Sequence, residues 1–176
     1  MDFEAPVDAW YVWLGVALVS LALVGIALSL PTQPPPDADR AANAIDRVSA
    51  SPYQAEASYE HDAEEVRITT AQVSLRNDGG ADHASVAFEQ VTPIYVVSQA
   101  VENGGEIQDV LTAILHGGNP TDVLEAHDVE TEAVVEAVAE TNEYVAADDD
   151  EWQPATGVLT VRQVTLDGEP VVLVDA

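Results

Sequence analysis

The sequence predicts an α+β protein with one N-terminal transmembrane helix, followed by a small domain that has a mainly antiparallel sheet and about three to four helices. Residues 9–30 carry no charge, which predicts the membrane helix. Alternating apolar positions in residues 66–91 and 157–174 indicate strands, and helical spacing in residues 107–144 indicates helices. Because strands and helices come in separate blocks, an antiparallel sheet is favoured over a doubly wound parallel one.

The same patterns divide the chain into four segments. We expect an acidic N-terminal tail over residues 1–8, a transmembrane helix over 9–30, a Pro-rich spacer over 31–37 and an acidic α+β domain over 38–176. A domain of this size can bury a modest core.

Residues 9–30 match a bilayer in length. As a helix they extend about 33 Å at 1.5 Å per residue, close to the thickness of a hydrocarbon core. Trp10, Tyr11 and Trp13 gather at one end, where aromatic rings favour the headgroup layer. A buried core helix would not need such a run in so acidic a chain. We therefore expect the lipid bilayer to be bound through Ala9 to Leu30.

A cleaved secretory signal is disfavoured because residues 1–8 contain Asp2, Glu4 and Asp8 but no basic side chain, and the apolar run is too long. On the other side, Pro31 and residues 34–36 stop the helix and hold an extended spacer.

The side of the membrane on which the domain lies is weakly encoded. Arg40 and Arg47 are the nearest basic side chains, and the positive-inside rule taken literally places the domain in the cytoplasm. Both lie ten or more residues from the span, among acids. A short tail before one span and a larger domain is equally the plan of a signal-anchored envelope protein, and we favour this outward orientation.

The charge balance is extreme. The 176 residues include 32 Asp and Glu against 5 basic residues, giving a net charge of −27. There is no Lys, and the five basic residues are Arg40, Arg47, Arg67, Arg76 and Arg162. A hydrophobic content of 47% argues against disorder. Molar salt shortens the Debye length to about 3 Å and screens repulsion between carboxylates, so the composition predicts a salt-adapted protein. An acidic partner-binding domain from an ordinary organism is the alternative.

Nucleic acid is not expected as a partner, because phosphate binding needs clustered basic side chains. The absence of cysteine excludes disulfides, thiolate metal sites and cysteine nucleophiles.

The first elements of the domain follow from local patterns. Residues 37–49 predict a helix with one apolar stripe. Val66 and Ile68, then Val73 and Leu75, alternate in opposite phases, which we interpret as one strand with a bulge near Thr70 or Ala71. Residues 77–80 form a turn, Ala84 to Val91 supply the return strand, and Ile94 to Val97 are a buried apolar run.

The second half begins with helices. Residues 107–115 form a helix stopped by Gly117 and Gly118, and Asn119 with Pro120 starts the next one. A further helix is predicted from Glu130 to Tyr144. Residues 157–166 and 170–174 then form a hairpin around Asp167 and Gly168.

Residues that could carry chemistry do not form a recognisable motif. The four histidines are His61, His83, His116 and His127, and no two have the helical spacing of a compact metal site. Residues 148–151 (DDDE) lack the glycine turn of a calcium loop. Nucleophile and phosphate-loop motifs are absent, and no carboxylate pair stands out. The sequence therefore assigns no catalytic, cofactor-binding or metal-binding residue and predicts no cofactor.

Three segments carry a resemblance: DAWYVWLGVALVSLALVGIALSLP, VTPIYVV and WQPATGVLTVRQV. The chain resembles an uncharacterised haloarchaeal family of short proteins with an N-terminal membrane segment. The resemblance implies a salt-loving archaeal source and a place near pilus-type secretion components, and it carries over no activity, ligand or catalytic residue.

Two functional classes stay open. The first is a non-enzymatic accessory or docking component of the envelope, with other envelope proteins as partners. It would not be a pilin, because Pro31 and residues 34–36 interrupt the membrane helix and no basic residue precedes it. The second is a membrane-tethered hydrolase that uses carboxylates or a metal, which predicts acids and a histidine converging in a concave pocket.

Overall fold

The computed structural model describes residues 9–29, 33–87, 90–147 and 152–176. It divides into two compact units, residues 1–33 and 34–176. The first contains α1 (Ala9–Leu28), whose described side chains are apolar or small on every face and exposed along the helix. The second unit is an α+β domain, which confirms the predicted fold class.

The domain opens with α2 (Ala38–Ser49), where a helix was predicted. Asp37 caps it, since its Oδ1 accepts from the amide of Arg40 at 3.0 Å. The first helical amide, that of Ala38, donates to Oδ2 of Asp82 at 3.0 Å. One face of α2 is buried and consists of Ala38, Ala41, Ala42, Ala44, Ile45 and Val48. The small alanines let the helix lie close to the strands beneath it.

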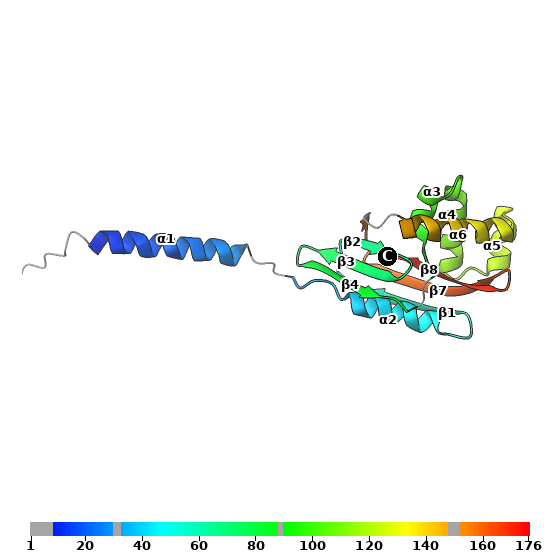
Figure 1. Cartoon of the computed structure of the whole chain (residues 1–176), viewed down its shortest axis with the longest axis horizontal. Helices are drawn as coiled ribbons and strands as arrows, with labels where there is room; N and C mark the ends of the chain where they lie inside the picture. Colours follow the sequence, from blue (N-terminus) through cyan, green and yellow to red (C-terminus); the bar gives the residue numbers. More distant parts are fainter. Residues whose placement is uncertain (1–8, 30–32, 88–89, 148–151) are drawn as a thin grey trace, which may run out of the picture. The chain divides into compact units, whose positions relative to one another are not determined.

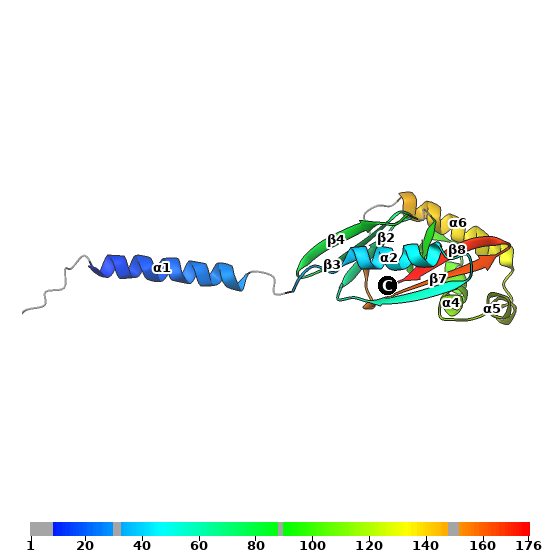
Figure 2. The same cartoon turned by 90° about the horizontal axis from the view of Figure 1, so that it is seen from below.

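Within the described residues, eight strands form two four-stranded sheets. Figures 1 and 2 show how the longer strands lie. The first sheet has the order β1-β7-β8-β5, from β1 (Ala55–Glu60), β7 (Val158–Leu166), β8 (Glu169–Asp175) and β5 (Val91–Pro93). Among the described strand pairs, β5 and β8 are the one pair that runs parallel. The second sheet has the order β4-β3-β2-β6, from β4 (Gly80–Ser85), β3 (Gln72–Asn77), β2 (Glu65–Ile68) and β6 (Gln153–Pro154).

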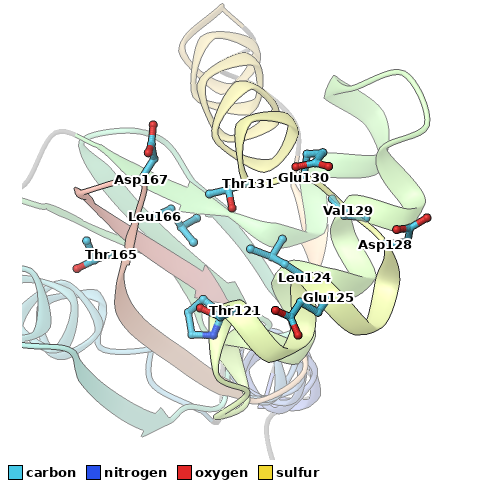
Figure 3. Close-up of a pocket in the computed structure, with 11 residues that line it drawn as sticks. Thr121, Leu124, Glu125, Asp128, Val129, Glu130, Thr131, Thr165, Leu166 and Asp167 are labelled. Atoms are coloured by element: carbon cyan, nitrogen blue, oxygen red, sulfur yellow. The ribbon is translucent and has the colours of Figure 1, made fainter.

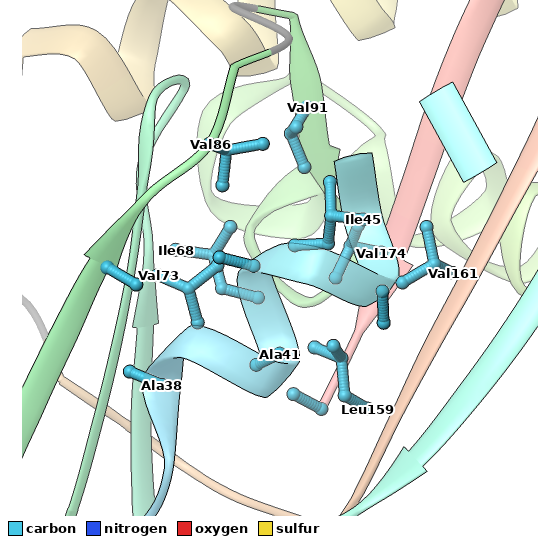
Figure 4. Close-up of a cluster of buried hydrophobic side chains, with 14 of the residues drawn as sticks. Ala38, Ala41, Ile45, Ile68, Val73, Val86, Val91, Leu159, Val161 and Val174 are labelled. Atoms are coloured by element: carbon cyan, nitrogen blue, oxygen red, sulfur yellow. The ribbon is translucent and has the colours of Figure 1, made fainter. Parts of the chain in front are cut away.

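The first hydrophobic cluster joins α2 to both sheets. Ile45 shares this cluster with Ile68 and Val73 from the second sheet and Leu159 and Val161 from the first (Figure 4). Because side chains alternate along a strand, this cluster takes only one face of β7 and β8.

The other face of the first sheet packs against helices. It supplies Val164, Leu166, Val171 and Leu173 to a second cluster. The helices of this layer are α3 (Val97–Ala100), α4 (Gly104–Leu115), α5 (Pro120–His127) and α6 (Thr131–Ala147), and the 3-10 turn η1 (Ile94–Val96) leads into them. Figure 1 shows α2 on one side of the strands and these helices on the other. Strands β7 and β8 are thus covered on both faces.

Arg162 of β7 links that sheet to the end of α4. Its Nη1 donates to the carbonyl oxygens of Ile114 and Gly118, the latter at 3.1 Å. A cation at the carboxyl end of a helix also favours the helix dipole. One of the five arginines is therefore committed to holding a helix on the sheet.

Several predicted elements are confirmed. The structure has the helices that start after Asn103 and Asn119, the helix over the predicted 130–144 and the hairpin around Asp167 and Gly168. The turn at residues 77–80 joins β3 to β4. Ile94, Val96 and Val97 are buried as expected.

The predicted bulge near Thr70 or Ala71 is wrong. The chain reverses there, with the amide of Thr69 donating to the carbonyl of Gln72 at 2.9 Å, so β2 and β3 form a hairpin. Ile68 lies opposite Val73, which explains the change of phase: both sets of apolar residues face the same core.

The return strand predicted for Ala84 to Val91 is wrong in its bounds. The strand that returns along β3 is β4, which ends at Ser85, whereas Val91 belongs to β5 in the other sheet. Residues 88–89 lie outside the described part of the chain. The sequence also gave no sign of β1, because its core-facing residues are only Ala55, Ala57 and Tyr59.

Candidate functional site

A groove of about 400 Å³ lies between α5, the start of α6 and the turn between β7 and β8 (Figure 3). Its floor contains Leu124 and Leu166, which are almost fully buried. Left-handed backbone conformations shape its rim. Asp128 has a φ of 55° where α5 ends, and Asp167 has a φ of 50° in the hairpin turn. The rim of the groove is therefore formed by two tight turns.

The rim of this groove is acidic, with Glu125, Asp128, Glu130 and Asp167 and no histidine among its lining residues. Figure 3 shows Asp128 and Asp167 at opposite sides of the opening, with their carboxylates turned away from each other. Over the described residues, no group of three or more His, Asp or Glu side chains is placed to hold a metal ion. The arrangement offers an apolar floor with negative edges, not an acid and a base facing one substrate atom.

The four histidines lie in different parts of the domain. His83 lies on β4 opposite Ser74, His116 ends α4 with its Nδ1 at 2.9 Å from the carbonyl oxygen of Thr112, and His127 is the last residue of α5. His61 follows β1. The structure brings none of them into the acidic groove. Residues 148–151, considered above for cation binding, lie outside the described residues.

His61 is the partly buried histidine. Its backbone amide donates to the carbonyl of Gly157 at 3.0 Å, and its ring Nδ1 accepts from the amide of Ala63 at 3.3 Å. The proton of the neutral ring therefore sits on Nε2, which is buried and has no hydrogen-bond partner in the described part of the chain. Burial lowers the pKa of His61, against a smaller opposing effect of Asp62. Burial therefore favours the neutral form of this imidazole.

A second open groove, of about 590 Å³, runs between α2 and β1. Arg40, Asn43 and Arg47 line one wall, and Ser58 and Tyr59 line the other. The spacing of the first three residues, i, i+3 and i+7, puts them on one helix face. This spacing was visible in the predicted helix 37–49. The other side of the groove could not be predicted, because no strand was expected at β1.

Two further arginines stack on one aromatic ring. The guanidinium carbons of Arg67 and Arg76 lie 5.4 and 4.3 Å from the ring centroid of Trp152. Arg76 also pairs with Glu65, which lowers the pKa of that carboxyl group and raises the pKa of Arg76. Cation–π contacts of this kind fasten the segment before β6 to the second sheet. Sequence reasoning missed this cluster because Trp152 is distant along the chain.

Comparison with known proteins places the chain in one family. A family model described as "Family of unknown function (DUF7283)" matches residues 4–164. No curated protein and no solved structure matches.

Proposed function

We propose that this chain, which belongs to the DUF7283 family of unknown function, is a single-span membrane protein whose acidic domain serves as a non-enzymatic accessory or docking component of the cell envelope. The observation that carries the proposal is α1. Within the described residues, Trp10–Leu28 is long and apolar enough to cross a membrane, and none of it is buried. A helix that is apolar on every face finds its preferred solvent in lipid.

The distribution of charge supports a salt-adapted domain. In the described part of the chain, the buried polar side chains are Ser74, Thr92, Thr141 and Gln163, and none of them is charged. The described carboxylates are therefore all at least partly exposed to counter-ions and water. At molar salt their repulsion is screened, and the acidic surface keeps the domain soluble. A salt-loving archaeal source fits this chemistry.

Docking, rather than hydrolysis, fits the surface. The hydrolase alternative required acids and a histidine converging in a pocket, and the acidic groove instead spreads its carboxylates around an apolar floor. The groove between α2 and β1 combines guanidinium, amide and hydroxyl groups, which suits recognition of a surface more than chemistry on it.

We propose that the domain lies on the extracytoplasmic side of the membrane. There, a pilus-like or secretion assembly would offer partners. Pro34 to Pro36 separate the end of α1 from the start of α2. A pilin continues its membrane helix into its head, so an accessory role beside such an assembly suits this chain better than the role of a subunit.

The test uses the full chain with a C-terminal tag, produced in cells kept in high salt. External protease should remove the tag from intact cells. Capture on the tag after mild detergent extraction should return envelope proteins in stoichiometric amounts. A tag that is protected until the cells are opened would contradict the outward orientation. Capture of the chain alone would contradict the docking role.

A further inference from the structure

The strand β1 is an edge of the first sheet. It pairs with β7 over all six of its residues, and no described strand pairs with its other side. An edge strand presents unpaired amide and carbonyl groups that can take up a further strand. Ala55, Ala57 and Tyr59 face the α2 side of the sheet, whereas Glu56 and Glu60 are exposed on the opposite face.

The wall beside this edge is unusual for so acidic a chain. Two of the five basic residues, Arg40 and Arg47, line the groove between α2 and β1, and among the described lining residues the one acid is Asp46. The Oδ1 of Asp46 accepts from the amide of Ala87 at 2.8 Å, which engages this carboxylate elsewhere. Arg40 also pairs through its Nε with Oδ2 of Asp37, the cap of α2, at 3.0 Å. The groove thus presents two guanidinium groups beside carboxylates that are already engaged.

Both walls are held rigidly. Asp82 of β4 accepts from the amide of Ala38 at the start of α2, and Asp46 near the end of α2 accepts from the amide of Ala87, just after β4. The loop from α2 to β1 is fixed by Gln163, which is 8% exposed. With its side-chain nitrogen turned to the loop, Gln163 donates to the carbonyl oxygens of Val48, Ser51 and Tyr53 at 2.9, 3.0 and 3.3 Å. A preorganised groove loses little freedom when it binds.

We propose that this groove docks an extended acidic segment of a partner protein, which adds a strand to the free edge of β1 and places carboxylates on Arg40 and Arg47. The inference rests on the proposed docking function and names the chemistry of the partner. Charge complementarity selects the occupant, since carboxylates match the planar, paired donors of arginine. Once the partner segment covers them, these contacts are screened less by salt than exposed ion pairs are.

The dimensions fit such a segment. Seven helical residues separate Arg40 from Arg47, which is about 10.5 Å along the axis of α2. Alternate residues of an added strand lie on one face at intervals of about 6.8 Å. Two carboxylates at positions two or four apart therefore come within reach of the two flexible arginine side chains. The other face of the added strand meets the level of Glu56 and Glu60, so its side chains there should be uncharged.

The test is a titration of the full chain, ¹⁵N-labelled and held in nanodiscs at high salt, with the capped peptide Thr-Glu-Thr-Glu-Thr-Glu-Thr. The amide signals of residues 55–60 should shift and exchange more slowly with solvent. Two altered peptides serve as matched controls: one carries Gln for every Glu, and one is N-methylated at alternate backbone positions so that it cannot pair. Each should bind at least about tenfold more weakly, as should the parent peptide with the Arg40→Gln, Arg47→Gln double variant.

Equal binding of the Gln peptide or of the double variant would overturn the role of charge, and equal binding of the N-methylated peptide would overturn strand addition. Shifts that map to the acidic groove instead of β1 would place the site elsewhere. Arg76→Gln, on the second sheet, is the control variant and should bind like the parent chain. If the double variant still captures the same envelope proteins from cells, this inference fails while the docking function stands. If the parent chain captures none, the function itself fails.

Discussion

The hydroxyl of Tyr95 accepts a hydrogen bond from the backbone amide of Ile68 at 3.0 Å. Tyr95 belongs to η1, which leads into the helical layer, and Ile68 ends β2 in the second sheet. The short strand β6 pairs only with Glu65 and Val66, so the tyrosine supplies an acceptor further along β2. Burial raises the pKa of Tyr95 and keeps its hydroxyl protonated. The Tyr95 side chain thus connects the helical layer to the second sheet.

Tyr95→Phe should lower the free energy of unfolding by about 1–3 kcal/mol, because it leaves the Ile68 amide without a partner in a buried place. Denaturant unfolding of the full chain in detergent at constant high salt measures this. Tyr53→Phe is the matched control, since that side chain is 80% exposed and should change stability by less than about 0.5 kcal/mol. Equal effects of the two substitutions would contradict the bridging role.

Gly104 and Gly105 should respond in opposite ways to alanine. A Cβ on Gly104 would collide with the carbonyl oxygen of Val97, whereas a Cβ on Gly105 meets nothing within 4 Å. Gly104→Ala must push α3 away from α4 and should cost at least about 1–3 kcal/mol. Gly105→Ala should stabilise by about 0.4–1 kcal/mol through the unfolded chain. Thermal unfolding of both variants decides, and a Gly104→Ala protein as stable as the parent would show that the two helices do not lie this close.

The stability of the domain should fall as the pH drops below about 6.5, the ordinary pKa of histidine. Because the pKa of His61 is lowered in the folded state, the unfolded chain binds the proton more readily in this range. Protonation also removes the acceptor that Nδ1 offers to Ala63. The loss saturates once the pH is below the folded pKa.

Denaturant unfolding at pH 8 and pH 5.5, at one salt concentration, measures this loss. The parent chain should lose more stability than His61→Gln, and His83→Gln is the control because His83 is exposed. Asp175 opposes the trend, since burial raises its pKa, and comparing variants removes its contribution. The same pH dependence in parent and His61→Gln would rule out His61 as its source.

Salt should stabilise the domain. Raising KCl from about 0.1 to about 3 M reduces the Debye length from about 10 Å to below 3 Å and removes repulsion among exposed carboxylates. The thermal midpoint should therefore rise steadily with KCl, as followed by circular dichroism. Unfolding on addition of salt, or a stable fold in dilute buffer, would instead favour the ordinary acidic binding domain.

Local patterns in the sequence predicted much of this fold, because its helices have clear stripes and caps. The stripe of Ala41, Ile45 and Val48 and the cap at Asn119 needed no tertiary information. Local patterns could not predict which distant segments of the chain pair with each other. The parallel contact of β5 with β8 and the bond from Ile68 to Tyr95 depend on how the layers stack.

The candidate site shows the same division. The spacing of Arg40, Asn43 and Arg47 on one helix face is a local property and was readable. That these residues line a groove depends on β1, which lies beside α2. Ala55 and Ala57 are too weakly apolar for the sequence to predict this strand. The stacking of Arg67 and Arg76 on Trp152 likewise appears only after folding brings β2, β3 and the segment before β6 together.

Extraction from membranes tests the central claim most directly. Vesicles carrying the full chain, washed in alkaline carbonate with salt kept high, should retain it in the pellet, because α1 would be held by the hydrocarbon core. A variant with Val19→Arg and Leu23→Arg, which puts two charges in the middle of α1, should move to the supernatant. Release of the parent chain by carbonate would contradict a membrane-spanning anchor.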